Sequence, residues 1–287
     1  LFLSGVRFDD NMAFLGAGAL QANSSLVKGD NLVFEDSFGY EAGALWAMSS
    51  DVELSHAVFI GNAAADGGGL AANESTVRGS NLVFVDNTVS DHGGGIDVTD
   101  WYEISTLDLE NITILSNVAG GRAGAVDGDG EGAKRLTNAI VAQNTVVSGN
   151  CGGLHGWVFT VRYSDAWENV PQIDVCVHWA DEPGNREGNT PDAPQFLDTT
   201  GVDPSTWDLH LDVSSPLVDA GDPTLLDPDG SISDMGAFGG PGAAGWDLDS
   251  DGYPAWWQPG PYDYATYPAQ GWDCDDLDPD VFPGSGC

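Results

Sequence analysis

Apolar and small polar residues recur with a fixed spacing along the first half of the chain. A large apolar residue closes each short apolar run, at Phe8, Phe34, Phe59, Phe84, Ile114 and Val141. These residues lie 26, 25, 25, 30 and 27 positions apart. Three positions after each of them stands Asn11, Ser37, Asn62, Asn87, Asn117 or Asn144, and a glycine phrase such as Gly68-Gly69-Leu70 keeps the same register. A period in the twenties is typical of a solenoid.

Each repeat contains three short β-prone segments. Another apolar residue stands seven positions before the large one, at Val27, Val52, Val77 and Leu107, and Gly, Asn, Asp and Ser separate the segments. Three short strands per repeat make a triangular coil, and stacked coils pair equivalent strands in parallel about 4.8 Å apart. The sequence therefore predicts an all-β fold, a right-handed parallel β-helix (solenoid), with the recurrent apolar positions stacked inward. The Leu-x-x-Leu-x-Leu phrase of a leucine-rich repeat does not occur.

The recurrent asparagines predict a ladder at one corner of the coil. Asn tolerates the left-handed backbone conformation, and its amide can hydrogen-bond the equivalent amides one coil above and below. Glycine is expected at the other sharp corner. The expected ladder consists of Asn11, Asn62, Asn87, Asn117 and Asn144.

Two phrases in register carry a family resemblance over about residues 1 to 150. Phe-x-x-Asn, as in Phe84 to Asn87, alternates with Gly-Gly-Ala-Ile-like phrases, as in Gly94-Gly95-Ile96. This pairing resembles the repeats of polymorphic outer-membrane proteins and related pectate-lyase-like β-helices. The resemblance implies an exported bacterial protein that is secreted or displayed on the cell surface. It does not imply an enzyme, because this fold hosts adhesins, structural fibres and polysaccharide-cleaving enzymes.

The charge excludes several classes of partner. The chain has 45 Asp and Glu against 8 Lys and Arg, a formal net charge of −37, so it repels nucleic acid and anionic membranes and favours bound cations. No apolar run of about 20 residues occurs, so we expect no membrane insertion. The chain begins at Leu1 inside a strand pattern, and we expect it to be processed or to be a fragment of a longer parent chain.

Three features interrupt the repeats. The insertion Thr99–Glu103 carries Trp101 and Tyr102, which either stack on a sugar ring of a glycan ligand or cover an apolar patch of their own loop. The acidic phrase 127–132 either binds a cation weakly or is a solvated turn. Beyond Asn144 we expect Tyr163 in the apolar position of a further coil, and a long loop over 185–194.

The cysteines predict one staple. Cys151 and Cys176 are 25 residues apart, which is one coil, and equivalent positions on adjacent coils lie within the Cα distance of a disulfide. In an oxidising compartment they are expected to be bonded, and the alternative is two separate buried thiols.

The segment 194–240 contains Ser215-Pro216-Leu217-Val218-Asp219-Ala220-Gly221 and ends in Asp234-Met235-Gly236-Ala237-Phe238. It resembles the closing coils at the C-terminal end of many exported bacterial β-helices. We expect it to cover the open end of the core, where strand edges and apolar rows are otherwise exposed. A possible second metal site is Asp227, Asp229 and Asp234.

The tail has the chemistry of a calcium site. Asp247, Asp249 and Asp251, then Gly252 and the carbonyl of Tyr253, form the first half of a calcium loop. The twelfth residue is Gln258 rather than Glu, so further ligands are expected from the cluster that begins at Asp273. Hard carboxylate oxygens without His, Met or thiolate favour calcium as the cofactor. The alternative is an acidic disordered tail.

The two acidic clusters together resemble the MopE-type metal-binding repeat. The resemblance implies metal ligation by Asp247, Asp249, Asp251, Asp273, Asp275, Asp276 and Asp278. The following Cys-Asp-Gly-x-Asp-x-Asp-Cys phrase of that family is missing, so Cys274 pairs with Cys287 or with nothing. We therefore divide the chain into a β-helix with closing coils, 1–243, and an Asp-rich metal-binding segment, 244–287.

Two function classes fit the sequence. The first is a non-catalytic, calcium-stabilised, extracellular or cell-surface structural or adhesive protein, either a filament subunit or part of a longer surface protein, with no catalytic residues. The alternative is a calcium-dependent polysaccharide lyase or glycoside hydrolase on the same fold. An enzyme needs a carboxylate pair, or an acidic cluster with a basic residue, on one outward face. The acids outside the tail show no such motif, and we expect no catalysis.

Overall fold

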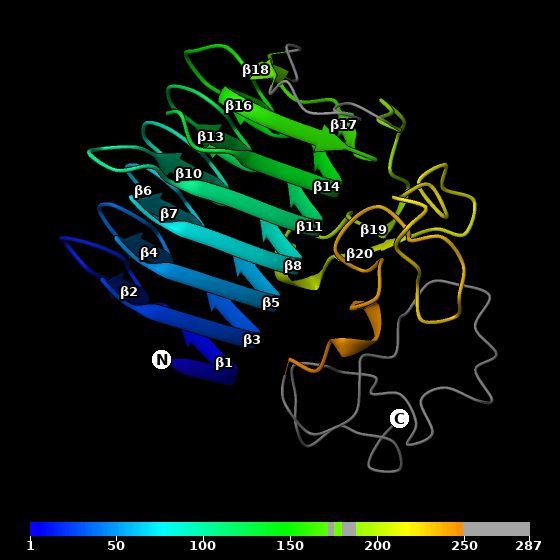
Figure 1. Ribbon diagram of the computed structural model, residues 1–287, viewed down its shortest axis with the longest axis horizontal. Coiled ribbons are helices and arrows are strands. Elements are labelled where there is room, and N and C mark those ends of the chain that lie inside the picture. The colour runs from blue at the N-terminus through cyan, green and yellow to red at the C-terminus, as the bar shows by residue number, and fades with distance from the viewer. Residues whose placement is uncertain (172–174, 180–187, 249–287) are drawn as a thin grey trace.

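The chain forms a parallel β-solenoid with almost no helix (Figure 1). The computed structural model describes residues 1–171, 175–179 and 188–248. One coil consists of β6 (Ala63–Ala64), β7 (Leu70–Asn73) and β8 (Thr76–Val85). Equivalent strands of successive coils pair in parallel and in register, as Phe34 with Phe59 and Phe59 with Phe84. The predicted three-sided coil and its spacing are confirmed.

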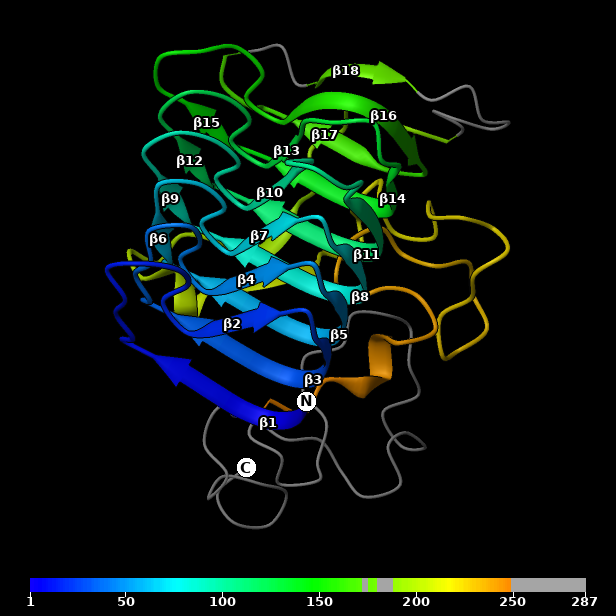
Figure 2. The ribbon, with the colours of Figure 1, turned by 60° about the vertical axis from the view of Figure 1, so that its left-hand side comes forward.

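Three stacks of strands build the coils, and Figure 2 shows the two shorter ones side by side. The long strands are β1 (Phe2–Asp9), β3 (Leu26–Glu35), β5 (Asp51–Ile60), β8, β11 (Thr106–Leu115) and β14 (Lys134–Ala142). The second stack is β2 (Leu20–Asn23), β4 (Leu45–Met48), β7, β10 (Ile96–Thr99) and β13 (Val126–Gly128). The third is β6, β9 (Thr88–Val89), β12 (Val118–Ala119) and β15 (Thr145–Val146). In the next coil, β16 (Leu154–Arg162) pairs with both β13 and the first half of β14, and β17 (Asp165–Trp167) pairs with the end of β14. β18 (Val175–Trp179) pairs with β16.

The core is built from the recurrent apolar positions. The rings of Phe8, Phe34, Phe59 and Phe84 stack at centroid distances of 4.8, 4.7 and 4.5 Å. Each fully buried Phe contributes about 1.5–3 kcal/mol through burial of apolar surface. At the glycine phrase the coils approach closely, since a Cβ on Gly68 would lie 2.3 Å from the carbonyl oxygen of Gly94. That contact explains why glycine recurs there.

The predicted asparagine ladder is present for four of its five members and extends one coil further, to Asn169. It runs without a break through Asn62, Asn87, Asn117, Asn144 and Asn169. Ser37 separates Asn11 from this run, and Asn11 is only half-buried. The left-handed conformation occurs one residue earlier, for example at Asp86 (φ 55°) and Ser116 (φ 58°), not at the ladder asparagines. The ladder amides therefore satisfy buried polar groups and do not make the turn.

A second polar corner bends each long strand. Asn31, His56, Asn81, Asn111 and Asn138 all have φ between 47° and 55°. Tyr163, with φ 47°, falls in this column. Our placement of Tyr163 in the apolar position was wrong, because Ala166 pairs with Val141 there. The corner requires a residue in the left-handed backbone conformation, and Asn tolerates that conformation well.

The C-terminal layer, which we define as residues 194–248, packs along the side of the solenoid (Figure 1, yellow to orange). It includes the antiparallel pair β19 (Phe196–Asp198) and β20 (Asp208–Leu211) and two 3₁₀ turns, Pro204–Thr206 and Ala243–Gly245. Leu217, Met235 and Trp246 are buried against the outward side of Val58, Val83 and their neighbours. The expectation that this segment covers the open end of the core is therefore wrong.

The second polar corner holds this layer in place. Asn81 donates from Nδ2 to the carbonyls of Ala237 (2.8 Å) and Gly239 (2.9 Å). His56 Nε2 lies 2.8 Å from Gly242 O, and Asn31 donates to Gly245 O. As the layer advances from residue 233 to 247 it thus runs back along the solenoid towards its first coils. Trp246 is 2% exposed, so packing continues past the boundary that we placed at 243.

The end of the described solenoid carries the predicted staple. Cys151 and Cys176 form a disulfide bond, with a Cα–Cα distance of 5.5 Å. Strand pairing aligns Cys176 with His155, so the two cysteines are one coil apart but are not register partners. Asn189 accepts from the backbone N–H of Ser164 and Thr190 pairs with Asp165, so this part of the predicted loop continues the coil stacking. Within the described ranges, no helix is long and apolar enough to cross a membrane.

Candidate functional site

Two columns of polar side chains face each other on the β7–β10–β13 side of the coil. The first, which we call the turn column, stands two residues before each glycine phrase and consists of Glu41, Asp66, His92 and Arg122. The second, the strand column, contains the outward residues of the short strands, Ala71, Asp97, Asp127 and His155, which are register partners. Alternation places their neighbours, such as Ile96 and Val98, in the core. The columns bring acids from different parts of the repeat together.

Between the columns lies an acid-lined cavity of about 450 Å³. Its lining comes from the turn column, the strand column and the inserted loop after β10: Glu41, Asp66, Ala71, Asn73, His92, Asp97, Thr99, Asp100, Trp101, Asp129 and Gly130. We expected the acids outside the tail to show no such grouping, and the structure corrects that expectation. Among the described residues, no lysine or arginine lines this cavity.

His92 lies between two carboxylates at the edge of the cavity. Its Nδ1 is 3.3 Å from Asp66 Oδ1, and its Nε2 is 2.8 Å from Asp91 Oδ1. The backbone N–H of His92 also donates to Asp66 Oδ1 at 3.0 Å. One ligand atom from each of the three residues can be chosen so that all lie within 4.8 Å of one another. Among the described residues this is the one such group.

Asp97 lies on the floor of the cavity and is 5% exposed. Its Oδ1 has no hydrogen-bond partner within the described part of the chain. Burial raises the pKa of Asp97 well above its usual value, and the negative charges of Asp127 and Asp66 raise it further. Burial likewise raises the pKa of Asp66. The cavity therefore holds carboxyl groups whose charges are poorly compensated by protein groups.

In contrast to Asp97, the carboxylate of Asp127, one coil further on, has charged partners. Arg122 Nε lies 2.9 Å from its Oδ2, and His155 Nδ1 lies 2.7 Å from its Oδ1. Arg122 also reaches Asp129 at 3.3 Å. The acidic phrase 127–132 is thus held partly by Arg122, which distinguishes Asp127 from Asp97 although both belong to one column.

The inserted loop forms the rim of the cavity. Asp100 accepts from the backbone N–H groups of Ser105 (2.7 Å) and Glu131 (2.7 Å), which ties the loop to the next coil. Trp101 lines the cavity and is 50% exposed, and Tyr102 is 93% exposed. Tyr102 therefore does not cover an apolar patch, and both rings are accessible to a ligand.

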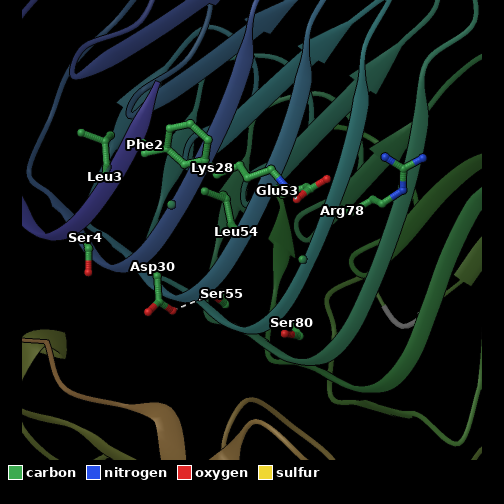
Figure 3. Close-up of a pocket in the computed structure, with 12 residues that line it drawn as sticks. Phe2, Leu3, Ser4, Lys28, Asp30, Glu53, Leu54, Ser55, Arg78 and Ser80 are labelled. Atoms are coloured by element: carbon green, nitrogen blue, oxygen red, sulfur yellow. Dashed lines mark hydrogen bonds and ion pairs between the residues drawn. The ribbon is translucent and has the colours of Figure 1, made fainter.

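A second hollow lies on the long-strand face near the N-terminus (Figure 3). Three of its lining residues, Lys28, Glu53 and Arg78, are successive register partners in a column of alternating charge. The column continues beyond the hollow through Asp108 and Arg135. Lys28 and Glu53 form an ion pair. Opposite charges one coil apart compensate each other, so this face offers no excess charge to a ligand.

The metal sites that we predicted fall partly outside the described residues. Asp247 donates its backbone N–H to Asn31 Oδ1 at 3.0 Å. Asp249, Asp251, Tyr253, Asp273, Asp275, Asp276, Asp278, Cys274 and Cys287 lie beyond the described range. Calcium binding and the second pairing of cysteines therefore stay predictions.

The proposed second site consists of acids that bind backbone N–H groups. Asp227 accepts from Gly240 N and Asp234 N, and Asp234 accepts from Asp219 N at 2.7 Å. Asp229 accepts from Ser231 N at 2.8 Å. Burial raises the pKa of Asp227 to about 7 and that of Asp234 to about 6. These bonds give the three acids a role in folding the C-terminal layer, and cation binding there stays a prediction.

No protein-family model, curated protein or solved structure matches this chain. The resemblances stated above therefore depend on the motifs themselves.

Proposed function

We propose that this protein is a non-catalytic, extracellular adhesive β-solenoid that binds a neutral glycan at the acid-lined cavity. The observation that carries the proposal is the position of Trp101, which Asp100 holds at the rim beside carboxylate-bearing walls. An aromatic face can stack on a sugar ring, and carboxylates accept hydrogen bonds from sugar hydroxyls. Because Asp100 fixes the loop before the ligand arrives, little conformational entropy is lost on binding.

The net charge of the chain supports a neutral ligand, and the disulfide supports an extracellular location. A chain with a net charge of −37 repels acidic polysaccharides, which leaves neutral sugars as ligands. A disulfide such as Cys151–Cys176 is typical of secreted and cell-surface proteins. We further propose right-handed coils, the usual hand of parallel crossovers, a calcium-stabilised tail, and assembly as a filament subunit or within a longer surface protein.

The test is a neutral-glycan array followed by titration calorimetry with the strongest binder. Trp101→Ala and Tyr102→Ala should weaken binding at least tenfold, because the stacking surface is removed while the fold remains. Trp157→Ala is the matched control, since Trp157 is equally exposed, at 49%, and lies outside this cavity. Equal loss of binding in all three variants, or no binding by the wild type, would contradict the proposal.

A second candidate is a glycoside hydrolase or lyase at the same cavity. The specific observation is Asp97, a buried carboxyl whose raised pKa suits a general acid, next to Asp127 on the same outward face. Incubation with the glycans that bind should then release reducing ends or unsaturated products, and Asp97→Asn should abolish the release. Binding without any product supports the adhesive function instead.

A further inference from the structure

We infer that Asp66, Asp91 and His92, together with Asp97, bind a divalent cation at the edge of the acid-lined cavity. This site is distinct from the predicted calcium tail and does not depend on glycan binding. Its residues come from two adjacent coils: Asp66 precedes one glycine phrase, and Asp91 and His92 precede the next.

The three first-named residues already have the geometry of a ligand set. Their candidate ligand atoms lie within 4.8 Å of one another, so one ion can contact all three after small side-chain rotations. The backbone fixes them, because Gly67 N donates to His92 O and His92 N donates to Asp66 Oδ1.

The burial of Asp97 is an independent observation that points to a bound cation. A carboxyl group that is 95% buried normally has hydrogen-bond or ionic partners, since isolated buried charge is strongly unfavourable. Oδ1 of Asp97 has none among the described residues, although the equivalent Asp127 has Arg122 and His155. Asp97 lines the same cavity as Asp66 and His92. A cation there would supply the compensation that Arg122 supplies one coil away.

The donor set selects the class of cation. Three carboxylates and one imidazole suit Zn²⁺ or Mn²⁺, because imidazole binds Zn²⁺ well and carboxylates suit both ions. Calcium prefers an all-oxygen shell of six to eight ligands. The site therefore differs in chemistry from the tail, whose candidate ligands are all oxygens.

The experiment uses the full chain, freed of metal by chelator and then kept in excess Ca²⁺ so that the tail is saturated. Titration calorimetry with Zn²⁺ and with Mn²⁺ compares the wild type with Asp66→Asn, His92→Gln and Asp97→Asn. Asp51→Asn, an exposed acid outside the cavity, is the matched control. The wild type and the control should bind one equivalent more than Asp66→Asn and His92→Gln, and Asp97→Asn should weaken binding at least tenfold.

Folding of each variant is checked by circular dichroism and by melting in chelator. Asp97→Asn is the variant most certain to fold, because it breaks no hydrogen bond at Oδ1 and removes a buried charge. Equal stoichiometry and affinity for the wild type and all three cavity variants would overturn the inference. A wild-type site that takes only Ca²⁺ would overturn the assignment of the cation.

Discussion

Removing one rung of the asparagine ladder should strongly destabilise the solenoid. Asn117 is fully buried, and its Oδ1 accepts from both the backbone N–H and the Nδ2 of Asn87, at 3.0 and 2.8 Å. Its own Nδ2 donates to Asn144 Oδ1 and to the carbonyls of Phe84 and Leu115. In Asn117→Ala the backbone N–H of Asn87 loses its acceptor in a site that water cannot reach.

The cost follows from the number of groups left without partners. Each buried polar group without a partner costs about 1–3 kcal/mol. Asn87 keeps one side-chain bond, to Phe59 O, and Asn144 Oδ1 keeps the backbone N–H at position 117. The backbone N–H of Asn87 and one hydrogen of its Nδ2 therefore lose their acceptor. For these two groups we expect a loss of about 3–5 kcal/mol of unfolding free energy.

Urea unfolding, followed in parallel by circular dichroism and tryptophan fluorescence, measures this loss. Asn11→Ala is the matched control, because Asn11 is half-buried and its side chain only donates to Asp9 O at 3.2 Å. Its cost should stay below about 1 kcal/mol, since water replaces the lost bond. If Asn117→Ala costs no more than Asn11→Ala, the ladder does not stabilise the fold in the way that we infer.

Further outcomes concern the staple, the C-terminal layer and the tail. Mapping without reduction should find Cys151 linked to Cys176, and replacing both by Ser should cost about 3 kcal/mol; free thiols would contradict the bond. Burial raises the pKa of Asp234 to about 6, so the folded state holds this proton more tightly, and the unfolding free energy should fall as the pH rises from about 4 through about 6. Asp227, whose pKa is about 7, contributes to the same slope, so Asp234→Asn should make the slope smaller in urea titrations, whereas Asp229→Asn, at an exposed side chain, should leave it unchanged. A calcium-selective chelator should lower the melting temperature and open the chain near residue 245 to protease; an unchanged melting curve would contradict calcium binding.

The sequence was sufficient to predict the features that each coil repeats. Phe59 and Phe84 stack because identical residues at a fixed period must meet when parallel strands stack in register. The same logic predicted that Asn87 and Asn117 hydrogen-bond each other, and that Cys151 lies near Cys176. Every one of these pairs is separated by one coil, so the period alone brings its members together.

Contacts that do not follow the period could not be predicted. Asn81 and Gly239 are 158 positions apart in the chain, and no repeat relates them. The corner residues Asn81 and Asn111 were visible as polar positions inside a strand pattern, but only the folded C-terminal layer shows what their amides bind. The closing segment was therefore placed on the wrong surface, at the end of the core and not along its side.

The acid-lined cavity could be predicted from the repeat period only in part. Glu41, Asp66, His92 and Arg122 share one place in the repeat, so an alignment of the glycine phrases would have revealed a charged column in four successive coils. That signal was present but not used, because the acids were weighed singly. That these residues lie close to Asp97 could be seen only in the structure, because Asp97 follows the glycine phrase on β10 whereas the turn column precedes that phrase.

A parallel solenoid repeats the same position about every 4.8 Å, so any column of like charge accumulates repulsion. The long-strand face avoids this by alternation, with Lys28 next to Glu53 and Glu53 next to Arg78. Asp127 is compensated differently, by Arg122 from the turn column. Asp97 forms no ion pair among the described residues, although it is more deeply buried than any of the alternating residues. The nearby charge of Arg122 lowers the pKa of Asp97, but burial and the neighbouring acids raise it by more. A carboxyl kept in that position therefore costs stability unless something outside the chain compensates it, and this is why we place a cation beside it.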